Sequence, residues 1–230
     1  MRIAKYIANA GLCSRRDAEK LIAQNKVKVN DQYCTHPSLK VNLNDKVTVS
    51  KKLIKLETKI RLWKMYKPVK YICTNNDPQK RKTIFSLIPK NFPRLISIGR
   101  LDFMSEGLLL FTNNGDIARK YELPSSNIQR VYRVCINGKV NLEDLLRINQ
   151  GIKINNLEYN KINVRIEKYK SEYTWLIIKL HEGKNREIRN ICDFFLWNIV
   201  NLVRIQYGSF KLIKQKPGEI IEIENFEKIL

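Results

Sequence analysis

Two short apolar runs with a highly charged segment between them constrain the fold of this chain most. Residues 95–98 read Leu-Ile-Ser-Ile, and residues 108–111 read Leu-Leu-Leu-Phe. Apolar runs of this length, bounded by turn residues, are typical of buried strands. Arg100 and Asp102 lie between them, and a carboxylate near the interior needs a partner because an unpaired buried charge is costly. We therefore expect Asp102 to be a paired acid held between two strands.

The spacing alone leaves the purpose of this charged segment open. An Arg100–Asp102 ion pair that only fixes a turn explains the pattern as well as a functional site does. Glu106 lies four residues after Asp102, and two carboxylates in one loop also suggest the acid pair of a glycosidase. The glycosidase interpretation is weaker, because it gives no reason for the positive charge of the chain.

Beyond residue 57, strand-like and helical stretches alternate, which favours an α+β fold. Strands are expected at 60–66, 132–136 and 174–180. Three helices are also expected: one after Asn113-Asn114-Gly115 with Asp116 as its cap, one from Leu142 to Gln150 with Gly151 as its stop, and an amphipathic one from Arg186 to Trp197.

The first fifty-odd residues predict a small unit of their own. Ile3, Tyr6 and Ile7 recur at helical spacing, and Ser14 begins a second helix in a pattern like a capping box. Two alternating stretches, 26–31 and 45–49, follow as short strands. Residues 1–56 carry 12 Lys and Arg against 4 Asp and Glu. The cations at the second helix and the next strand form either a solvated face or a phosphate-binding surface: Arg15, Arg16, Lys20, Lys26 and Lys28.

The whole chain is strongly basic, with 43 Lys and Arg against 22 Asp and Glu among 230 residues and a net charge of +21. Because 43 % of the residues are hydrophobic, the chain can bury a core, and the charge then lies on a folded surface and not on a disordered tail. Such a surface attracts polyanions, of which nucleic acid is the commonest in a cell. Compositional drift toward Lys, Ile and Asn is an alternative source of part of the lysine excess.

Membrane binding is the competing explanation for the charge, and the sequence does not favour it. The apolar runs are far shorter than the roughly 20 residues that a spanning helix needs. The start, Met1-Arg2-Ile3-Ala4-Lys5, lacks the apolar core of a signal peptide. We therefore expect a cytoplasmic protein that binds no membrane.

The cysteines form an odd set without a C-x-x-C pair, and only two histidines accompany them. This pattern suggests neither a disulfide framework nor a zinc site. We expect no bound metal and expect the cysteines to act as small buried hydrophobic residues: Cys13, Cys34, Cys73, Cys135 and Cys192.

Two further segments combine charge with a defined local structure. From His181 to Arg189 a strand end runs through Gly183 into a helix start rich in cations, which is typical of an anion site or of ordinary surface charge. In Arg130-Val-Tyr-Arg-Val, Tyr132 and Val134 point to one side of a strand and the arginines to the other. A buried core tyrosine explains that second pattern equally well.

The N-terminal stretch resembles the S-four-type RNA-binding domain, first described in a ribosomal protein of the small subunit. The residues that carry the resemblance are Met1 to Ala8, Gly11, Ser14 to Glu19 and Val27 to Asn30. The resemblance implies a small α/β RNA-binding domain over residues 1–56. It does not name any chemistry.

The remaining motifs together resemble the RsuA/RluB/RluE/RluF group of ribosomal RNA pseudouridine synthases, over nearly the whole chain. The segments concerned are Gly99 to Asp102, Glu106 to Asn113 with Gly115, Tyr132 to Val134, Glu182 to Arg186 with Ile188-Arg189, and Leu202 to Ile205 with Gly208. The resemblance implies that residues 57–230 form a catalytic domain with a mixed, mainly antiparallel sheet. It further implies a monomer without cofactor that isomerises a uridine of ribosomal RNA to pseudouridine.

The same resemblance assigns roles to individual residues. Asp102 is expected as the catalytic carboxylate, Tyr132 as the aromatic that stacks on the target base, and Arg189 as the basic partner of Asp102. The cations expected to bind RNA, with one amide among them, are Arg15, Arg16, Lys20, Lys28, Arg100, Lys184, Asn185 and Arg186. The chain departs from the group at two positions: Lys70 stands where a glycine is usual and Ser105 where a threonine is commoner.

Two alternatives from other classes stay open at this point. A non-catalytic RNA-binding or ribosome-assembly protein with the same fold would lack Asp102, Tyr132 or Arg189, and all three are present. A DNA-binding protein would show the same excess of charge, and competition between RNA and DNA at matched salt would separate the two.

Overall fold

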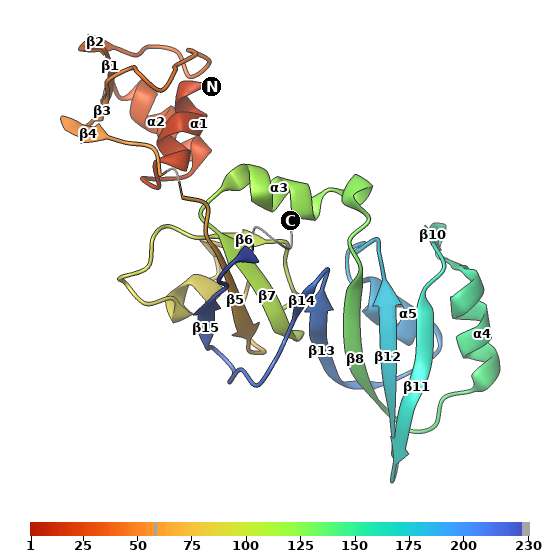
Figure 1. Ribbon diagram of the computed structural model, residues 1–230. Coiled ribbons are helices and arrows are strands. Elements are labelled where there is room, and N and C mark those ends of the chain that lie inside the picture. Colours follow the sequence, from red (N-terminus) through yellow and green to blue (C-terminus); the bar gives the residue numbers. More distant parts are fainter. Residues whose placement is uncertain (58, 227–230) are drawn as a thin grey trace. The chain divides into compact units, whose positions relative to one another are not determined.

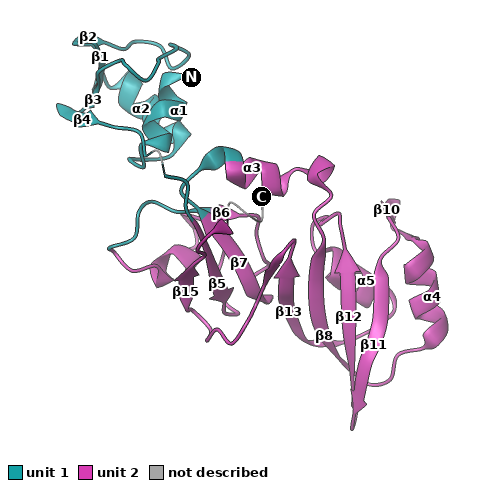
Figure 2. Ribbon diagram, in the orientation of Figure 1, with its two compact units in different colours: residues 1–61, 91–96, 112–116 teal, residues 62–90, 97–111, 117–230 magenta. Residues whose placement is uncertain are grey.

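The chain folds as two compact units, and the computed structural model describes residues 1–57 and 59–226. Unit 1 consists of residues 1–61, 91–96 and 112–116, and unit 2 of residues 62–90, 97–111 and 117–230 (Figure 2). The two later segments of unit 1 have no signature in the sequence. The predicted division after residue 56 stays a prediction.

Unit 1 contains two short helices and a four-stranded antiparallel sheet. Helices α1 (Ile3–Asn9) and α2 (Arg15–Ala23) form where the sequence predicts them, and the Ser14 hydroxyl caps α2 by accepting the Asp17 backbone N–H at 3.1 Å. The strands β1 (Val27–Val29), β2 (Gln32–Tyr33), β3 (Val47–Val49) and β4 (Lys52–Ile54) lie in the order β2-β1-β3-β4. Aliphatic side chains of both helices and of β1 and β3 form its core.

Unit 2 carries most of a nine-stranded mixed sheet in which β13 and β7 run parallel, whereas the outer pairs are antiparallel (Figure 1). The order is β11-β12-β8-β13-β7-β5-β15, with β14 on β13 and β6 on β7. The sheet agrees with the predicted α+β class. The strands are β5 (Leu62–Lys67), β6 (Ile96–Ile98), β7 (Glu106–Thr112), β8 (Arg130–Asn137), β11 (Asn163–Lys170), β12 (Tyr173–Leu180), β13 (Ile199–Tyr207), β14 (Phe210–Lys211) and β15 (Ile220–Glu222).

Two helices cover one face of this sheet. Helix α4 (Leu142–Gln150) ends at Gly151, as predicted, and the hairpin β9 (Ile152–Ile154) and β10 (Leu157–Tyr159) follows it. The apolar side of helix α5 (Glu187–Phe194) packs against the sheet, in one core cluster with side chains of β8 and β12. The sequence overestimates α5 at its C-terminal end, because Leu196 adopts a left-handed φ of 58° and stops the helix before Trp197.

Helix α3 (Gly115–Glu122) corrects the predicted cap. The side-chain oxygen of Asn114 accepts the backbone N–H of Asp116 at 2.9 Å, so Asn114 caps the helix and Asp116 lies in its first turn. An asparagine supplies the same acceptor oxygen as an aspartate at this position, and the sequence pattern alone did not separate the two.

The cysteines are free, but two of them are less buried than predicted. Cys34, Cys135 and Cys192 are buried, whereas Cys13 and Cys73 are half-buried. Within residues 1–57 and 59–226, no helix has the length and apolarity that crossing a membrane would require.

Candidate active site

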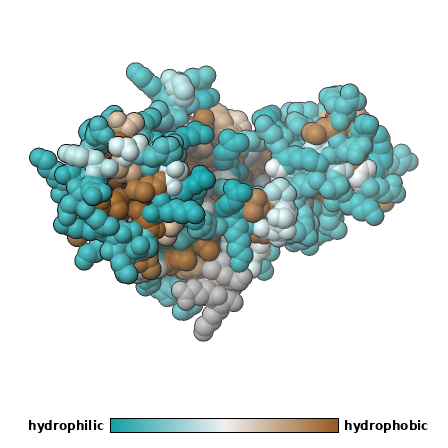
Figure 3. All heavy atoms as spheres, turned by 90° about the horizontal axis from the view of Figure 1, so that it is seen from above, coloured by the Kyte–Doolittle hydropathy of each residue, from teal (hydrophilic) through white to brown (hydrophobic). Residues whose placement is uncertain are grey.

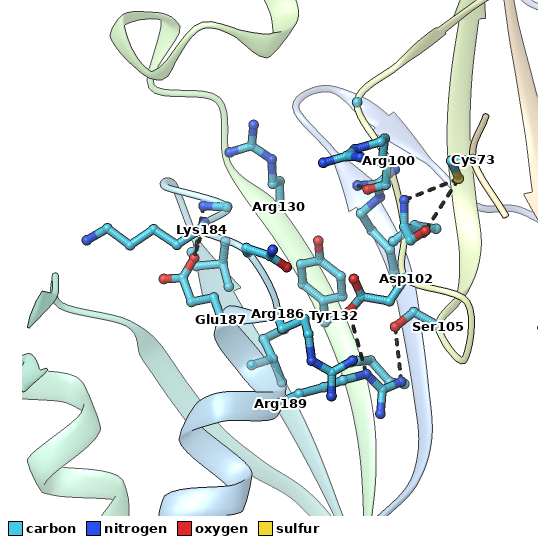
Figure 4. A pocket seen from close by; sticks show the side chains of 18 of the residues that line it. Cys73, Arg100, Asp102, Ser105, Arg130, Tyr132, Lys184, Arg186, Glu187 and Arg189 are labelled. Atoms are coloured by element: carbon cyan, nitrogen blue, oxygen red, sulfur yellow. Dashed lines mark hydrogen bonds and ion pairs between the residues drawn. The ribbon is translucent and has the colours of Figure 1, made fainter. Parts of the chain in front are cut away.

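A pocket of about 760 Å³ lies in unit 2, on the face of the sheet that carries α5 (Figure 4). Its walls come from the segment between β6 and β7, from the ends of β8 and β13, and from the turn that leads into α5. The lining includes Asp102, Tyr132 and Arg189. The fold thus brings together three residues that lie far apart in the sequence.

Asp102 and Arg189 face each other as an ion pair. The Nε of Arg189 lies 3.6 Å from Oδ2 of Asp102, and the two side chains are 14 % and 33 % exposed. The Nη2 of Arg189 donates to the Met104 carbonyl at 2.9 Å and to the Ser105 hydroxyl at 3.1 Å. Burial lowers the pKa of Arg189, and the nearby Asp102 opposes that shift. The guanidinium is therefore held in place while one side of the Asp102 carboxylate stays open to the pocket.

A buried lysine fixes the backbone that carries Asp102. Lys67 is fully buried at the end of β5, and its ammonium donates to the carbonyls of Pro68, Asp102 and Ser105 at 3.0, 3.1 and 2.7 Å. All three of its N–H donors thus have an acceptor. Burial lowers its pKa to about 8. Lys67 therefore positions the loop of Asp102 through its backbone carbonyls. Sequence patterns did not identify this role.

The departure at Lys70 has a clear structural consequence. Lys70 adopts φ 63°, a left-handed conformation in which a glycine avoids the steric cost of a side chain. Its backbone N–H nevertheless donates to the Phe103 carbonyl at 2.7 Å. The loop after Pro68 is therefore tied to the loop of Asp102 although the usual glycine is absent.

Tyr132 stands beside Asp102 in the pocket (Figure 4). It lies on β8 opposite Ile178 of β12, so it points to the same side as the apolar core. Its ring is half-buried, and it packs against that core without being enclosed by it. The ring is therefore partly accessible from the pocket.

The turn that leads into α5 is organised by a buried carboxylate. One oxygen of Glu187 accepts the backbone N–H groups of Gly183 and Lys184, both at 2.9 Å. Burial raises the pKa of Glu187, and its other oxygen has no hydrogen-bond partner among the residues that the structure describes. Arg130 supports the turn from β8 by donating to the carbonyls of His181 and Glu182. It points to the same side of β8 as Tyr132 and lines the same pocket, which corrects the prediction that both arginines of this segment point away from that ring. Gly183 is required here, because it has φ 91° and a Cβ would lie 3.3 Å from the Arg130 guanidinium.

Comparison with known proteins agrees with these motifs. The RNA pseudouridylate synthase family matches residues 61–193, and the S4 domain matches residues 1–47. An uncharacterised RNA pseudouridine synthase of Rickettsia felis is 47 % identical over 97 % of each chain. The chain belongs to the RNA pseudouridine synthase family. The expected membership of the RsuA/RluB group is confirmed, and the protein is an isomerase of this class.

Other members extend the comparison. An uncharacterised RNA pseudouridine synthase of Aquifex aeolicus is 36 % identical over 99 % of this chain and 92 % of its own. The ribosomal large subunit pseudouridine synthase B of Haemophilus influenzae is 32 % identical over 97 % of this chain and 65 % of its own. A crystal structure of a pseudouridylate synthase has a TM-score of 0.70 at 23 % identity and covers 99 % of this chain and 97 % of its own, which shows the shared fold.

The predicted RNA-binding residues of this pseudouridine synthase divide between the units. Arg100, Lys184, Asn185 and Arg186 line the pocket of unit 2. Lys184 also pairs with Glu182 at 2.8 Å. The others belong to unit 1, on α2 and β1: Arg15, Arg16, Lys20 and Lys28.

The glycosidase interpretation has no support in the geometry of this site. Glu106 does not line the pocket. Its carboxylate accepts hydrogen bonds from the hydroxyl of Tyr66 at 3.0 Å and from the amide of Asn201. Residues 76–82, which contain Lys80, Arg81 and Lys82, form a basic loop that an internal ion pair stabilises. In it, Arg81 donates two hydrogen bonds to the buried Asp77, at 2.8 Å and 2.9 Å. Within the described ranges, no three His, Cys, Asp or Glu side chains group as a metal site.

Proposed function

We propose that this protein isomerises a uridine of structured ribosomal RNA to pseudouridine and that Asp102 is the catalytic carboxylate. The observation that supports this role most directly is the Asp102–Arg189 pair at 3.6 Å, partly exposed at the wall of the pocket. The Arg189 guanidinium places a positive charge beside this carboxylate in a partly buried site. The remaining oxygen of Asp102 faces the space where a nucleotide would bind.

The reaction needs no change of oxidation state. The bond between N1 of uracil and C1′ of ribose breaks, the detached base turns, and a new bond joins C5 to C1′. C5 then loses its proton and N1 carries one in the product, so the formula is unchanged. A carboxylate beside the sugar serves this sequence either as a nucleophile at C1′ or as the base that removes a sugar proton. Asp102 has the position and charge for either role.

Tyr132 and the surrounding cations serve substrate binding in this proposal. A uridine in structured RNA must leave its stack to enter the pocket, which costs a few kcal/mol. An aromatic ring such as Tyr132 recovers part of this cost by stacking on the extruded base. Arg100, Lys184 and Arg186 at the rim provide donors for the phosphates on either side, and Asn185 adds an amide.

Unit 1 supplies non-specific affinity for RNA in this proposal, with residues 1–56 as an RNA-binding domain and residues 57–230 as the catalytic domain. Arg16 and Lys28 are at least partly exposed on α2 and β1. Two relatives are named as synthases that act on the large ribosomal subunit, which supports ribosomal RNA as the substrate. Because one chain provides all three pocket residues, a monomer suffices. Ribosomal RNA as the substrate supports a cytoplasmic location.

Pseudouridine mapping tests the proposal. Ribosomal RNA from cells that lack this protein is incubated with it, and pseudouridines are detected by the mass shift after chemical labelling. We expect new modification with the unaltered protein and none with Asp102→Asn. Glu106→Gln is the matched control, because it removes a carboxylate four residues away that does not line the pocket. Modification by Asp102→Asn at the unaltered rate would refute the assignment.

A further inference from the structure

The sheet of unit 2 has a second face, which points away from α4 and α5. In Figure 1, α5 lies behind β12, whereas β8, β12 and β11 are in front. The charged and aromatic residues of these three strands that point to this side are here called the open face. They are Arg133 on β8, Tyr173, Trp175 and Lys179 on β12, and Arg165, Glu167, Lys168 and Lys170 on β11.

The strand register shows how the cations come to share this face. Arg133 lies opposite Ile177, which in turn lies opposite Arg165, so these two arginines point to the same side. A β-bulge between Ile166 and Lys168 then inserts one extra residue in β11. Without the bulge, the alternation of a strand would direct Lys168 and Lys170 to the helix-covered side. With it, both lysines join the open face.

Aromatic rings lie among these cations. The guanidinium of Arg133 lies over the Trp175 ring at 4.1 Å from its centroid. Tyr173 lies two residues before Trp175 on the same side of β12 and is 42 % exposed. The other two tryptophans of the chain, Trp63 and Trp197, are buried. Trp175 is therefore the tryptophan that a partner can reach.

The charge of the open face is strongly one-sided. Its only acid is Glu167, which pairs with Arg133 at 2.7 Å. Arg165, Lys168 and Lys170 are exposed and Lys179 is half-buried. Glu106, farther across the sheet, is already hydrogen-bonded by Tyr66 and Asn201. The face of the molecule seen in Figure 3 is largely hydrophilic as well. What distinguishes the open face is that its cations surround aromatic rings.

We propose that the open face binds a second segment of the substrate RNA, apart from the nucleotide in the pocket. Cations that hold phosphates and aromatic rings that stack on bases are the combination by which sheets bind RNA. The proposal rests on the proposed function, because it concerns the RNA that carries the target uridine. It implies that a long structured RNA is bound more tightly than a short one containing only the target loop.

Trp175 reports binding at this face directly. Its fluorescence is measured while RNA is added to the full-length protein, first as a short stem-loop with the target and then as the surrounding ribosomal RNA domain. We expect the domain to quench the emission and the stem-loop to leave it unchanged. Trp175→Phe should abolish the response. Equal quenching by both RNAs, or by neither, would overturn the proposal.

Charge reversal tests whether the lysines of the open face contribute to the affinity for RNA. Lys168→Glu with Lys170→Glu changes two exposed side chains, and we expect about a tenfold rise in KM for the RNA domain with kcat unchanged, and no change for the stem-loop. Lys214→Glu with Lys216→Glu is the control with the same change of net charge at exposed positions off the open face. Equal effects of the two double variants would overturn the proposal.

These readouts separate this proposal from the proposed function. If the unaltered protein modifies no uridine but Trp175 emission still responds to the RNA domain, the function is wrong and the binding face stands. If modification occurs and Lys168→Glu with Lys170→Glu behaves as the control does, the function stands and the open face does not bind RNA. Quenching of Trp175 by an acidic protein and not by RNA would also overturn it.

Discussion

The pocket of unit 2 and the basic surface of unit 1 use positive charge in opposite ways. Next to the pocket, the ammonium of Lys67 is fully buried and bonded to three carbonyls, and in the pocket Arg189 is fixed by Asp102, Met104 and Ser105. In unit 1, Lys20 is 74 % exposed and pairs with Asp17, its neighbour on the same helix. The first arrangement fixes the position of Asp102 and its loop, and the second leaves exposed positive charge that can bind a polyanion.

This difference separates two contributions to enzyme activity. Exposed ion pairs contribute little to stability and are screened by salt. A held cation in a partly desolvated pocket fixes the geometry of a reacting group, and small displacements there cost large factors in rate. Changes in the pocket should therefore lower kcat, whereas changes in unit 1 should weaken binding in a salt-dependent way. The predictions below test this division.

Arg189→Met should have the largest effect of these changes. It removes the partner of Asp102 and both bonds to the loop at 104–105. We expect kcat to fall about 10²–10³-fold, with RNA affinity nearly unchanged. Arg147→Met is a suitable control, because Arg147 stacks near Phe194 and Phe195 and does not line the pocket. A tenfold loss of affinity with unchanged kcat would break the comparison.

Lys67→Met should lower kcat about 10²-fold, because three carbonyls lose their donor and the loop of Asp102 can shift.

The buried ammonium of Lys67 should also make the stability of the unaltered protein depend on pH, with a defined sign. The native pKa of about 8 lies below the ordinary 10.5, so between these values the unfolded chain binds more protons and the free energy of unfolding rises with pH. Denaturant unfolding from pH 7 to 10.5 should show this rise, and Lys67→Met should lack it. Parallel curves would contradict the burial of this charge.

Arg16→Gln with Lys28→Gln should change affinity rather than rate. Each lost phosphate contact lowers the slope of log affinity against log salt by about 1. We expect weaker binding at low salt, a shallower slope, and unchanged kcat at saturating RNA. Lys51→Gln with Lys55→Gln is the control, since both are exposed cations of unit 1 outside α2 and β1. Equal slopes for the two double variants would show that net charge alone matters.

Glu187→Gln should have the smallest effect and should be stabilising. Burial raises the pKa of Glu187, so the native state loses stability relative to the unfolded chain as the pH rises through the titration of this carboxyl. Glutamine keeps an oxygen that can accept the N–H groups of Gly183 and Lys184. We expect the melting temperature at pH 7 to rise by about 2–4 °C. The gain should shrink on acidification, as the wild-type carboxyl becomes protonated. A loss of stability at pH 7 would show that the charge itself is needed.

Much of the fold could be predicted, because periodic patterns and caps act locally. Ser14 and Gly151 mark a helix start and a helix end that the structure confirms. The α+β class and the relation to pseudouridine synthases also followed from the sequence. The Asn114 cap and the early end of α5 at Leu196 were missed, because several side chains compete locally for the same position.

The supporting contacts of the site could not be predicted, because they join distant segments. Lys67 and Arg130 each donate hydrogen bonds to two carbonyls that lie between 35 and 52 residues away in the sequence. Nothing near them in sequence indicates those acceptors. The bulge at Glu167 is equally hidden, since it is defined by pairing with β12. The open face therefore emerges only from the three-dimensional register.

The most direct test of the central claim is single-turnover isomerisation by Asp102→Asn, with RNA affinity measured in the same samples across a range of salt concentrations. The rate is followed by release of tritium from C5 of labelled uridine. We predict that the rate falls at least about 10³-fold, whereas the affinity and its salt slope match those of the unaltered protein. An unchanged rate, or a rate that falls only in proportion to lost affinity, would contradict the assignment of Asp102 as the catalytic carboxylate.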